Sequence, residues 1–182
     1  DRCLSRGLGD VYKRQRYNDY WSFITTLIEY ICPMNVSVDF TYQTEFVLVD
    51  EQMFVNWLTK CAKQYSATAM ALVYAFMDDE ALLELNFKYL NHNTLTDIIT
   101  FDDTVGKDVS ANIAISVTRV RENAVEQNVP FDEELLRVMS HGLLHCLGFK
   151  DKTEFQIADM RSAEQACIKL FHVEQNLSLI HI

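Results

Sequence analysis

The chain has 182 residues, of which 49% are hydrophobic and 23% charged, the balance of a folded globular protein. It contains only 5 glycines and 2 prolines, so long low-complexity linkers are not expected. The formal net charge of −10 at pH 7 argues against broad, non-specific binding to nucleic acid, because phosphates attract basic surfaces. Any contact with RNA would therefore need a local basic patch.

The two ends of the chain share a feature that has nothing to do with folding. Codons for Asp10–Gln15 and for 177–182 can be chosen so that the two strings are reverse complements, and both resemble a transposase end used in sequencing libraries. We therefore predict that residues 1–15 and 177–182 are adapter-derived and not native, and exclude them from fold reasoning. Residues 16–35 hold an apolar run too short to span a membrane; a leader, a core helix and translated upstream sequence are all open, and the last is preferred.

The remaining cysteines carry no CxxC pair, which suits reduced thiols in a cytoplasmic protein. Residues 36–42 alternate apolar and polar, which predicts a strand. Residues 50–64 have apolar side chains at helical spacing, with Asp50 as the N-cap. The continuous apolar run at 69–77 predicts a buried strand, and a helix capped by Asp78 follows it.

The second half of the native chain also mixes strand and helix patterns. A polar turn begins it, and two strands, a short charged helix and two longer helices follow. The irregular alternation predicts a single α+β domain with a mixed sheet of about four strands, packed with helices. The predicted segments are the turn at 91–94, strands at 97–101 and 111–117, and helices at 118–127, from Asp132 onward, and at 154–171.

His141 and His145 are four residues apart on the helix that Asp132 opens, so both rings lie on one face. This spacing lets two nitrogens reach one tetrahedral ion at about 2.0–2.1 Å. Gly148 can adopt the left-handed conformation that ends a helix, and Asp151 then lies where the returning chain can supply a third ligand. The alternative is a pair of buried structural histidines, because this helix is apolar on nearly every side.

The residue after His141 is Gly142, where peptidases of the HExxH type carry the glutamate that acts as general base. Glycine cannot transfer a proton, so peptide hydrolysis by that mechanism is disfavoured. A metal alone can still lower the pKa of water and polarise a phosphoryl oxygen, so cleavage of a phosphodiester fits better. Three protein ligands leave one position open, as in catalytic zinc sites.

Two blocks of the sequence carry a family resemblance. LNFKY followed by TDIITF, which ends at Phe101, is similar to LNxxYR…TDVLSF, and HGLLHCLGFKD at 141–151 is similar to HGxLHLxGYDH. Over residues 36–172 the chain thus resembles the YbeY family of bacterial metal-dependent endoribonucleases. The resemblance implies a zincin-like fold with the metal-binding helix in the core. It also implies one Zn²⁺ held by His141, His145 and Asp151, with Asp151 in place of a third histidine.

The resemblance further implies a cytoplasmic, single-strand-specific endoribonuclease. Its partner would be ribosomal RNA or the small ribosomal subunit, in maturation of the 3′ end of the small-subunit RNA and in ribosome quality control. The general base is not identified: either a metal-bound water or the 2′-hydroxyl of the RNA attacks the phosphodiester. Leu90 stands where the family has a catalytic Arg, which leaves a non-catalytic, metal-stabilised ribosome-associated factor as the alternative.

Other residues are weaker candidates. Thr96 and Asp97 are expected to support the site through hydrogen bonds behind the ligands, with strand capping as the alternative. His92 could contact substrate or simply be a solvated loop residue. A last group could contact phosphates, although a solvated helix face is the safer interpretation: Lys88, Arg119 and Arg121. The sequence does not indicate an oligomeric state.

Overall fold

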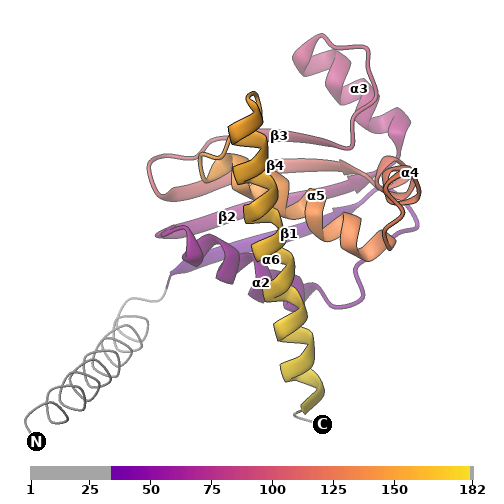
Figure 1. The fold of residues 1–182 in the computed structure, drawn as a ribbon. Coiled ribbons are helices and arrows are strands. Elements are labelled where there is room, and N and C mark those ends of the chain that lie inside the picture. The colour runs from indigo at the N-terminus through magenta and orange to yellow at the C-terminus, as the bar shows by residue number, and fades with distance from the viewer. Residues whose placement is uncertain (1–33, 181–182) are drawn as a thin grey trace, which may run out of the picture. The chain divides into compact units, whose positions relative to one another are not determined.

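Four strands form one mixed sheet in the order β1-β2-β4-β3 (Figure 1). β2 (Ala69–Met77) and β4 (Asp108–Ser116) run parallel in the middle, and β3 (Ile98–Asp102) pairs antiparallel with β4. β1 (Asn35–Tyr42) lies at the other edge, beside β2. The predicted α+β class with a four-stranded mixed sheet is confirmed.

The computed structural model describes residues 34–180. The predictions for residues 1–15 and for most of 16–35 therefore lie outside the described residues. Residues 177–182 are described in part, as the end of the last helix, and their adapter origin stays a prediction. No helix within the described residues is long and apolar enough to cross a membrane.

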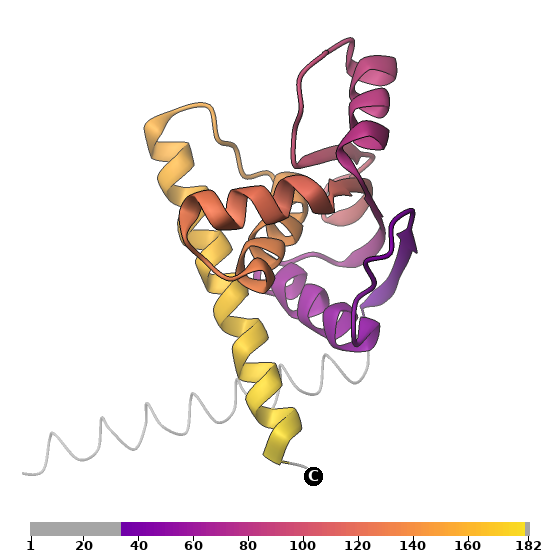
Figure 2. The same cartoon turned by 90° about the vertical axis from the view of Figure 1, so that its right-hand side faces the viewer.

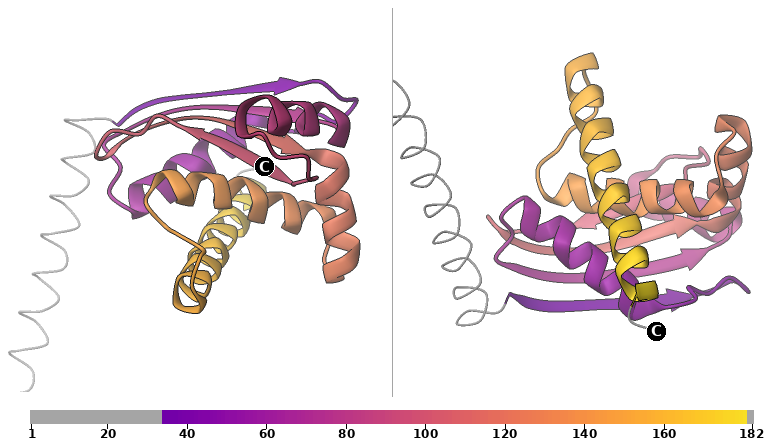
Figure 3. Two further views of the ribbon diagram at one scale, coloured as in Figure 1. Left: turned by 90° about the horizontal axis from the view of Figure 1, so that it is seen from above. Right: turned by 60° about the horizontal axis from the view of Figure 1, so that its bottom comes forward.

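Helices cover the sheet unequally. α2 (Glu51–Gln64), α5 (Phe131–Cys146) and α6 (Glu154–Ile180) lie on the same side of it (Figure 3). α3 (Asp79–Leu90) packs on the opposite face, and α4 (Val117–Gln127) follows β4 directly. α6 runs past both α5 and α2 and contacts each of them (Figure 2). α5 is thus the central helix, between the sheet and α6.

The two faces of the sheet follow from the period-2 alternation of its strands. Tyr74 of β2 points to α5, where its hydroxyl donates to the Met139 carbonyl at 3.0 Å. Ile99 and Ala114 point the other way, into a small core under α3 that also holds Leu82. α5 therefore packs on the larger core, on one face of the sheet, and α3 packs on a smaller core on the other face.

The helix starts are encoded locally. The Asp50 carboxylate accepts from the Met53 amide at 3.1 Å, and the Asp78 carboxylate accepts from the Ala81 amide at 2.9 Å. These bonds satisfy backbone N–H groups that a first helical turn leaves without partners. Both predicted N-caps are confirmed. Ser116 caps α4 in the same way, which the sequence analysis did not anticipate.

Several predicted boundaries differ from the structure, most by one residue, and three of the differences have a clear physical reason. β4 begins at Asp108, before the predicted 111, because the parallel ladder with β2 extends strand geometry into polar residues. α5 begins at Phe131 with Pro130 at the N-cap position; the fixed φ of Pro130, −60°, suits the entry to a helix. α6 continues past 171, since no glycine or proline follows to stop it.

Candidate metal site

The three predicted metal ligands, His141, His145 and Asp151, lie together at the C-terminal end of α5 and in the loop after it. The two Nε2 atoms are 2.9 Å apart. The Asp151 Oδ2 atom lies 3.6 Å from His145 Nε2 and 3.9 Å from His141 Nε2. The histidine rings are partly buried, whereas the Asp151 side chain is 46% exposed, so the cluster has one open side.

These distances suit a single ion. A circle through the three atoms has a radius of about 2.0 Å, which matches the distances of about 2.0–2.2 Å from zinc to histidine nitrogen and carboxylate oxygen. Two imidazoles with one carboxylate are also a donor set found in catalytic zinc sites. The residues therefore fit a bound zinc ion without rearrangement.

The hydrogen bonds behind the rings fix their tautomers. His141 Nδ1 lies 2.7 Å from Glu164 Oε1, and His145 Nδ1 lies 3.1 Å from the Phe149 carbonyl oxygen. A backbone carbonyl and an ionised carboxylate can only accept, so each neutral ring carries its proton on Nδ1. Two Nε2 lone pairs then face each other across 2.9 Å, a contact that a bound metal ion would make favourable.

Gly148 brings Asp151, the predicted third ligand, back to the helix. Its φ of +95° is left-handed, and the Phe149 amide donates to the Leu144 carbonyl at 3.0 Å, which closes a Schellman motif. The Phe149 ring packs edge-on against Tyr65 at 5.1 Å between ring centroids. The predicted role of Gly148 as a helix terminator is confirmed, and the anchored turn also supplies the acceptor for His145.

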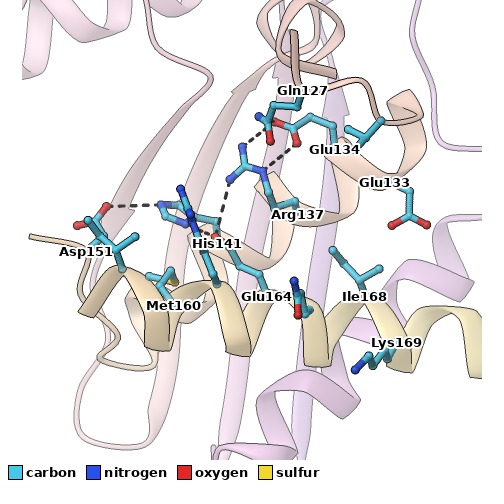
Figure 4. A pocket seen from close by; sticks show the side chains of 14 residues that line it. Gln127, Glu133, Glu134, Arg137, His141, Asp151, Met160, Glu164, Ile168 and Lys169 are labelled. Carbon is cyan, nitrogen blue, oxygen red and sulfur yellow. Dashed lines mark hydrogen bonds and ion pairs between the residues drawn. The ribbon is translucent and has the colours of Figure 1, made fainter. Parts of the chain in front are cut away.

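Arg137 connects two buried carboxylates behind His141 (Figure 4). Its guanidinium donates to both oxygens of Glu134, at 2.9 and 2.7 Å, and lies 3.8 Å from Glu164 and 3.4 Å from Asp97. The hydrogen bonds with Glu134 raise the pKa of Arg137 above its ordinary value, although burial alone would lower it. Arg137 therefore stays charged and offsets both the Glu134 carboxylate and the Glu164 carboxylate that holds His141.

Gly142 faces away from the metal ligands and into the sheet. A Cβ atom at this position would lie 2.9 Å from Ile98 Cδ1 and 3.2 Å from two atoms of Ile113. The glycine thus allows α5 to approach β3 and β4 closely. This explains in physical terms why a glutamate of the HExxH type has no place here.

A cavity of about 870 Å³ lies between α5 and α6 and opens on His141 and Asp151. Ile157, Met160 and Ile168 provide apolar walls, and charged residues of both signs line the rest. Its position places a ligand-sized space beside the metal ligands.

The sequence matches the family described as Endoribonuclease YbeY over residues 39–172. The chain belongs to this family. An Endoribonuclease YbeY from Flavobacterium johnsoniae is 49% identical over 138 residues, which cover 76% of this chain and 99% of that protein. One from Cytophaga hutchinsonii is 39% identical over 132 residues, which cover 72% and 92%.

Among solved structures, the solution structure of a protein from Thermotoga maritima aligns with a TM-score of 0.57 and 23% identity. The alignment covers 78% of this chain and 93% of that one. At this identity the likeness speaks for the fold alone, and it supports the α+β architecture described above.

The weaker candidate residues of this YbeY-family chain differ in whether hydrogen bonds or ion pairs connect them to the histidine cluster. Asp97 joins the network through Arg137 and also accepts from the Asn123 side chain at 3.3 Å. The Thr96 hydroxyl donates to the Ile98 carbonyl at 3.2 Å. The His92 side chain is exposed and makes no hydrogen bond or ion pair with any described residue. Their roles stay predictions, but only Asp97 is connected to the cluster.

Glu164 is the residue that the sequence analysis missed. It is 5% exposed, on α6, and its carboxylate reaches His141 from a different helix. A glutamate in a helix rich in charged residues ordinarily indicates a solvated face. The only local signal was its position between apolar residues that are spaced for burial, Met160 and Cys167 among them.

Proposed function

We propose that this chain is a zinc-dependent endoribonuclease that cleaves single-stranded RNA. In this proposal it acts in the cytoplasm on ribosomal RNA of the small subunit, in maturation of the 3′ end and in ribosome quality control. Family membership supports the endoribonuclease activity. The observation that carries the metal dependence is the pair of Nε2 atoms 2.9 Å apart, with both Nδ1 protons committed elsewhere and Asp151 beside them.

Zn²⁺ at this position would polarise a phosphoryl oxygen and lower the pKa of water. His141, His145 and Asp151 would hold the ion. Glu164 keeps the His141 ring in the tautomer that presents Nε2, and Arg137 offsets the negative charge of Glu164. Because Asp151 adds a charge that a third histidine would not, the ion should be a weaker Lewis acid than in a three-histidine site.

A second candidate function is a metal-stabilised ribosome-associated factor without catalysis. Leu90, at the end of α3, is 47% exposed, and α3 packs on the face of the sheet opposite to α5. Among the described residues, the carboxylate that lies against His141, that of Glu164, is already hydrogen-bonded. The other glutamates that line the cavity, Glu133 and Glu134, are paired as well, so none of the three is free to act as general base.

Zinc content and RNA cleavage, measured on the same samples, test the proposal. We expect His141→Ala and Asp151→Ala to lose zinc and cleavage of single-stranded RNA together. His172→Ala is the matched control, since His172 binds Glu133 at 2.6 Å and is in no group of described residues that could hold a metal ion. Unchanged zinc content in both ligand variants would end the metal assignment. Full zinc occupancy of the wild type without cleavage would favour the second function.

A further inference from the structure

Three polar side chains, Arg161, Gln165 and Lys169, repeat every four residues along α6, so they share one face. All three line the cavity that opens on His141 and Asp151. None of the three makes a hydrogen bond or ion pair with another residue that the structure describes. We call them the α6 polar face.

The acids that line the same cavity are, in contrast, paired. Glu134 and Glu164 lie 2.7 and 3.8 Å from the Arg137 guanidinium, and Glu133 lies 2.6 Å from His172 Nε2. Asp151 faces the two metal-ligand histidines. Among the described residues of the cavity, the charges left for a ligand are therefore those of two cations on α6.

The basic residues on other helices have partners already. Arg119 binds Asp79 at 2.6 Å and Glu122 at 2.7 Å. The Arg121 guanidinium lies 5.4 Å from the centroid of the Phe131 ring, in a cation–π contact. A chain with a net charge of −10 needs a local basic surface to bind RNA, and the α6 polar face provides one beside the metal site.

We propose that the α6 polar face binds the sugar–phosphate backbone of a single-stranded RNA whose reacting phosphate lies at the metal site. This inference rests on the proposed function. Arg161 and Lys169 are eight residues apart, about 12 Å along the helix axis, so they contact different phosphates. Arg161 is three residues from Glu164, which holds His141, so it contacts the phosphate nearer the metal site. The Gln165 amide lies between the two and contacts ribose or base edges.

The apolar part of the cavity favours a single strand over a duplex. Ile157, Met160 and Ile168 line it beside the polar face. In a single strand the bases can unstack and lie against apolar side chains, whereas in a duplex they are paired and shielded. The cavity between α5 and α6 then takes bases, and the α6 polar face takes the backbone.

The experiment measures binding of a fluorescent 2′-O-methyl oligouridylate by anisotropy, over a range of salt concentrations. We expect Arg161→Gln and Lys169→Gln each to reduce the slope of log K against log salt by about 0.7, roughly a fivefold loss of affinity at 0.1 M salt. Lys60→Gln is the matched control, because it removes the same charge on α2, which contributes no residue to the cavity. Zinc content should be unchanged in all three variants.

Slopes for Arg161→Gln and Lys169→Gln equal to the wild-type slope would overturn the inference. An equal loss in Lys60→Gln would also overturn it. So would an equal effect of the Arg161 and Lys169 substitutions on binding of a duplex or of polyglutamate. If the wild type cleaves no RNA but the two slopes fall as expected, the binding surface stands and the nuclease proposal fails. If the wild type cleaves RNA and the slopes do not change, the nuclease proposal stands and the binding surface fails.

Discussion

The hydrogen bond from His141 to Glu164 gives the sharpest test of the metal site. Glu164→Gln keeps the size and shape of the side chain, and its amide oxygen can still accept from His141 Nδ1. The substitution removes only the charge. Because Glu164 is 5% exposed and its hydrogen bond to His141 is 2.7 Å long, solvent screens that charge poorly.

The expected loss can be worked from this contact. A hydrogen bond to a charged partner contributes about 1.5–3 kcal/mol and a neutral one about 0.5–1.5 kcal/mol, so the change costs about 1–1.5 kcal/mol. That corresponds to roughly a tenfold loss of zinc affinity. Glu164→Ala removes the bond altogether, and its loss should approach the upper end of the roughly 10- to 100-fold range for residues that support a metal ligand.

Competition with a chromophoric zinc chelator measures both affinities. Glu133→Gln is the matched control, since it makes the same change in the same cavity on a carboxylate that binds His172. We expect its zinc affinity to stay within about twofold of the wild type, as for a substitution outside the ligand network. The reasoning is refuted if Glu164→Gln binds zinc as tightly as Glu133→Gln does.

Three further substitutions or measurements test the surroundings of the site. Gly142→Glu restores the HExxH pattern but places a charge against Ile98. It should lower the free energy of unfolding, measured in urea, by about 3 kcal/mol or more, and it should give no peptidase activity. A variant as stable as the wild type would contradict this. Gly148→Ala should lower the free energy of unfolding by about 1–2 kcal/mol, since the φ of Gly148 is +95°. It should also weaken zinc binding by displacing Asp151. An unchanged stability together with an unchanged zinc affinity would argue against this role of the Gly148 turn. Burial, with the nearby Asp102 charge, raises the pKa of Cys146 to about 12, so the folded protein keeps this thiol protonated at pH 8 and alkylation should be fast only in denaturant. Because the thiol ionises first in the unfolded chain, its contribution to stability should fall as the pH rises from about 9 towards 12, and a stability that rises over that interval would contradict this pKa.

Local patterns predicted most of the elements because their causes are local. The apolar run at 69–77 predicted both ends of β2 correctly. The carboxylates of Asp50 and Asp78 lie where a first helical turn needs acceptors. The cluster of His141 and His145 was predictable for the same reason, since helical periodicity alone sets their common face. Gly148 then limited where a third ligand could lie.

The rest depended on contacts between distant segments. Glu164 reaches His141 across 23 residues, and nothing in its own helix distinguishes it from a solvated glutamate. Arg137 lies four residues before His141, but its role depends on three carboxylates that only the fold brings together: Asp97, just before β3, Glu134 on α5 and Glu164 on α6. The start of β4 likewise depends on pairing with β2 rather than on its own polar residues.

The charges around the metal site explain why a cation and the α6 polar face belong together. Three carboxylates, those of Asp97, Glu134 and Glu164, surround the guanidinium of Arg137, and a fourth, that of Asp151, lies 3.9 Å from His141. Their mutual repulsion in a partly buried place favours a counter-ion, and a divalent cation would offset two of the three excess negative charges. The charge that remains still repels an approaching phosphate. A nucleic-acid substrate therefore needs unpaired cations close by, and among the described residues of the cavity α6 supplies them.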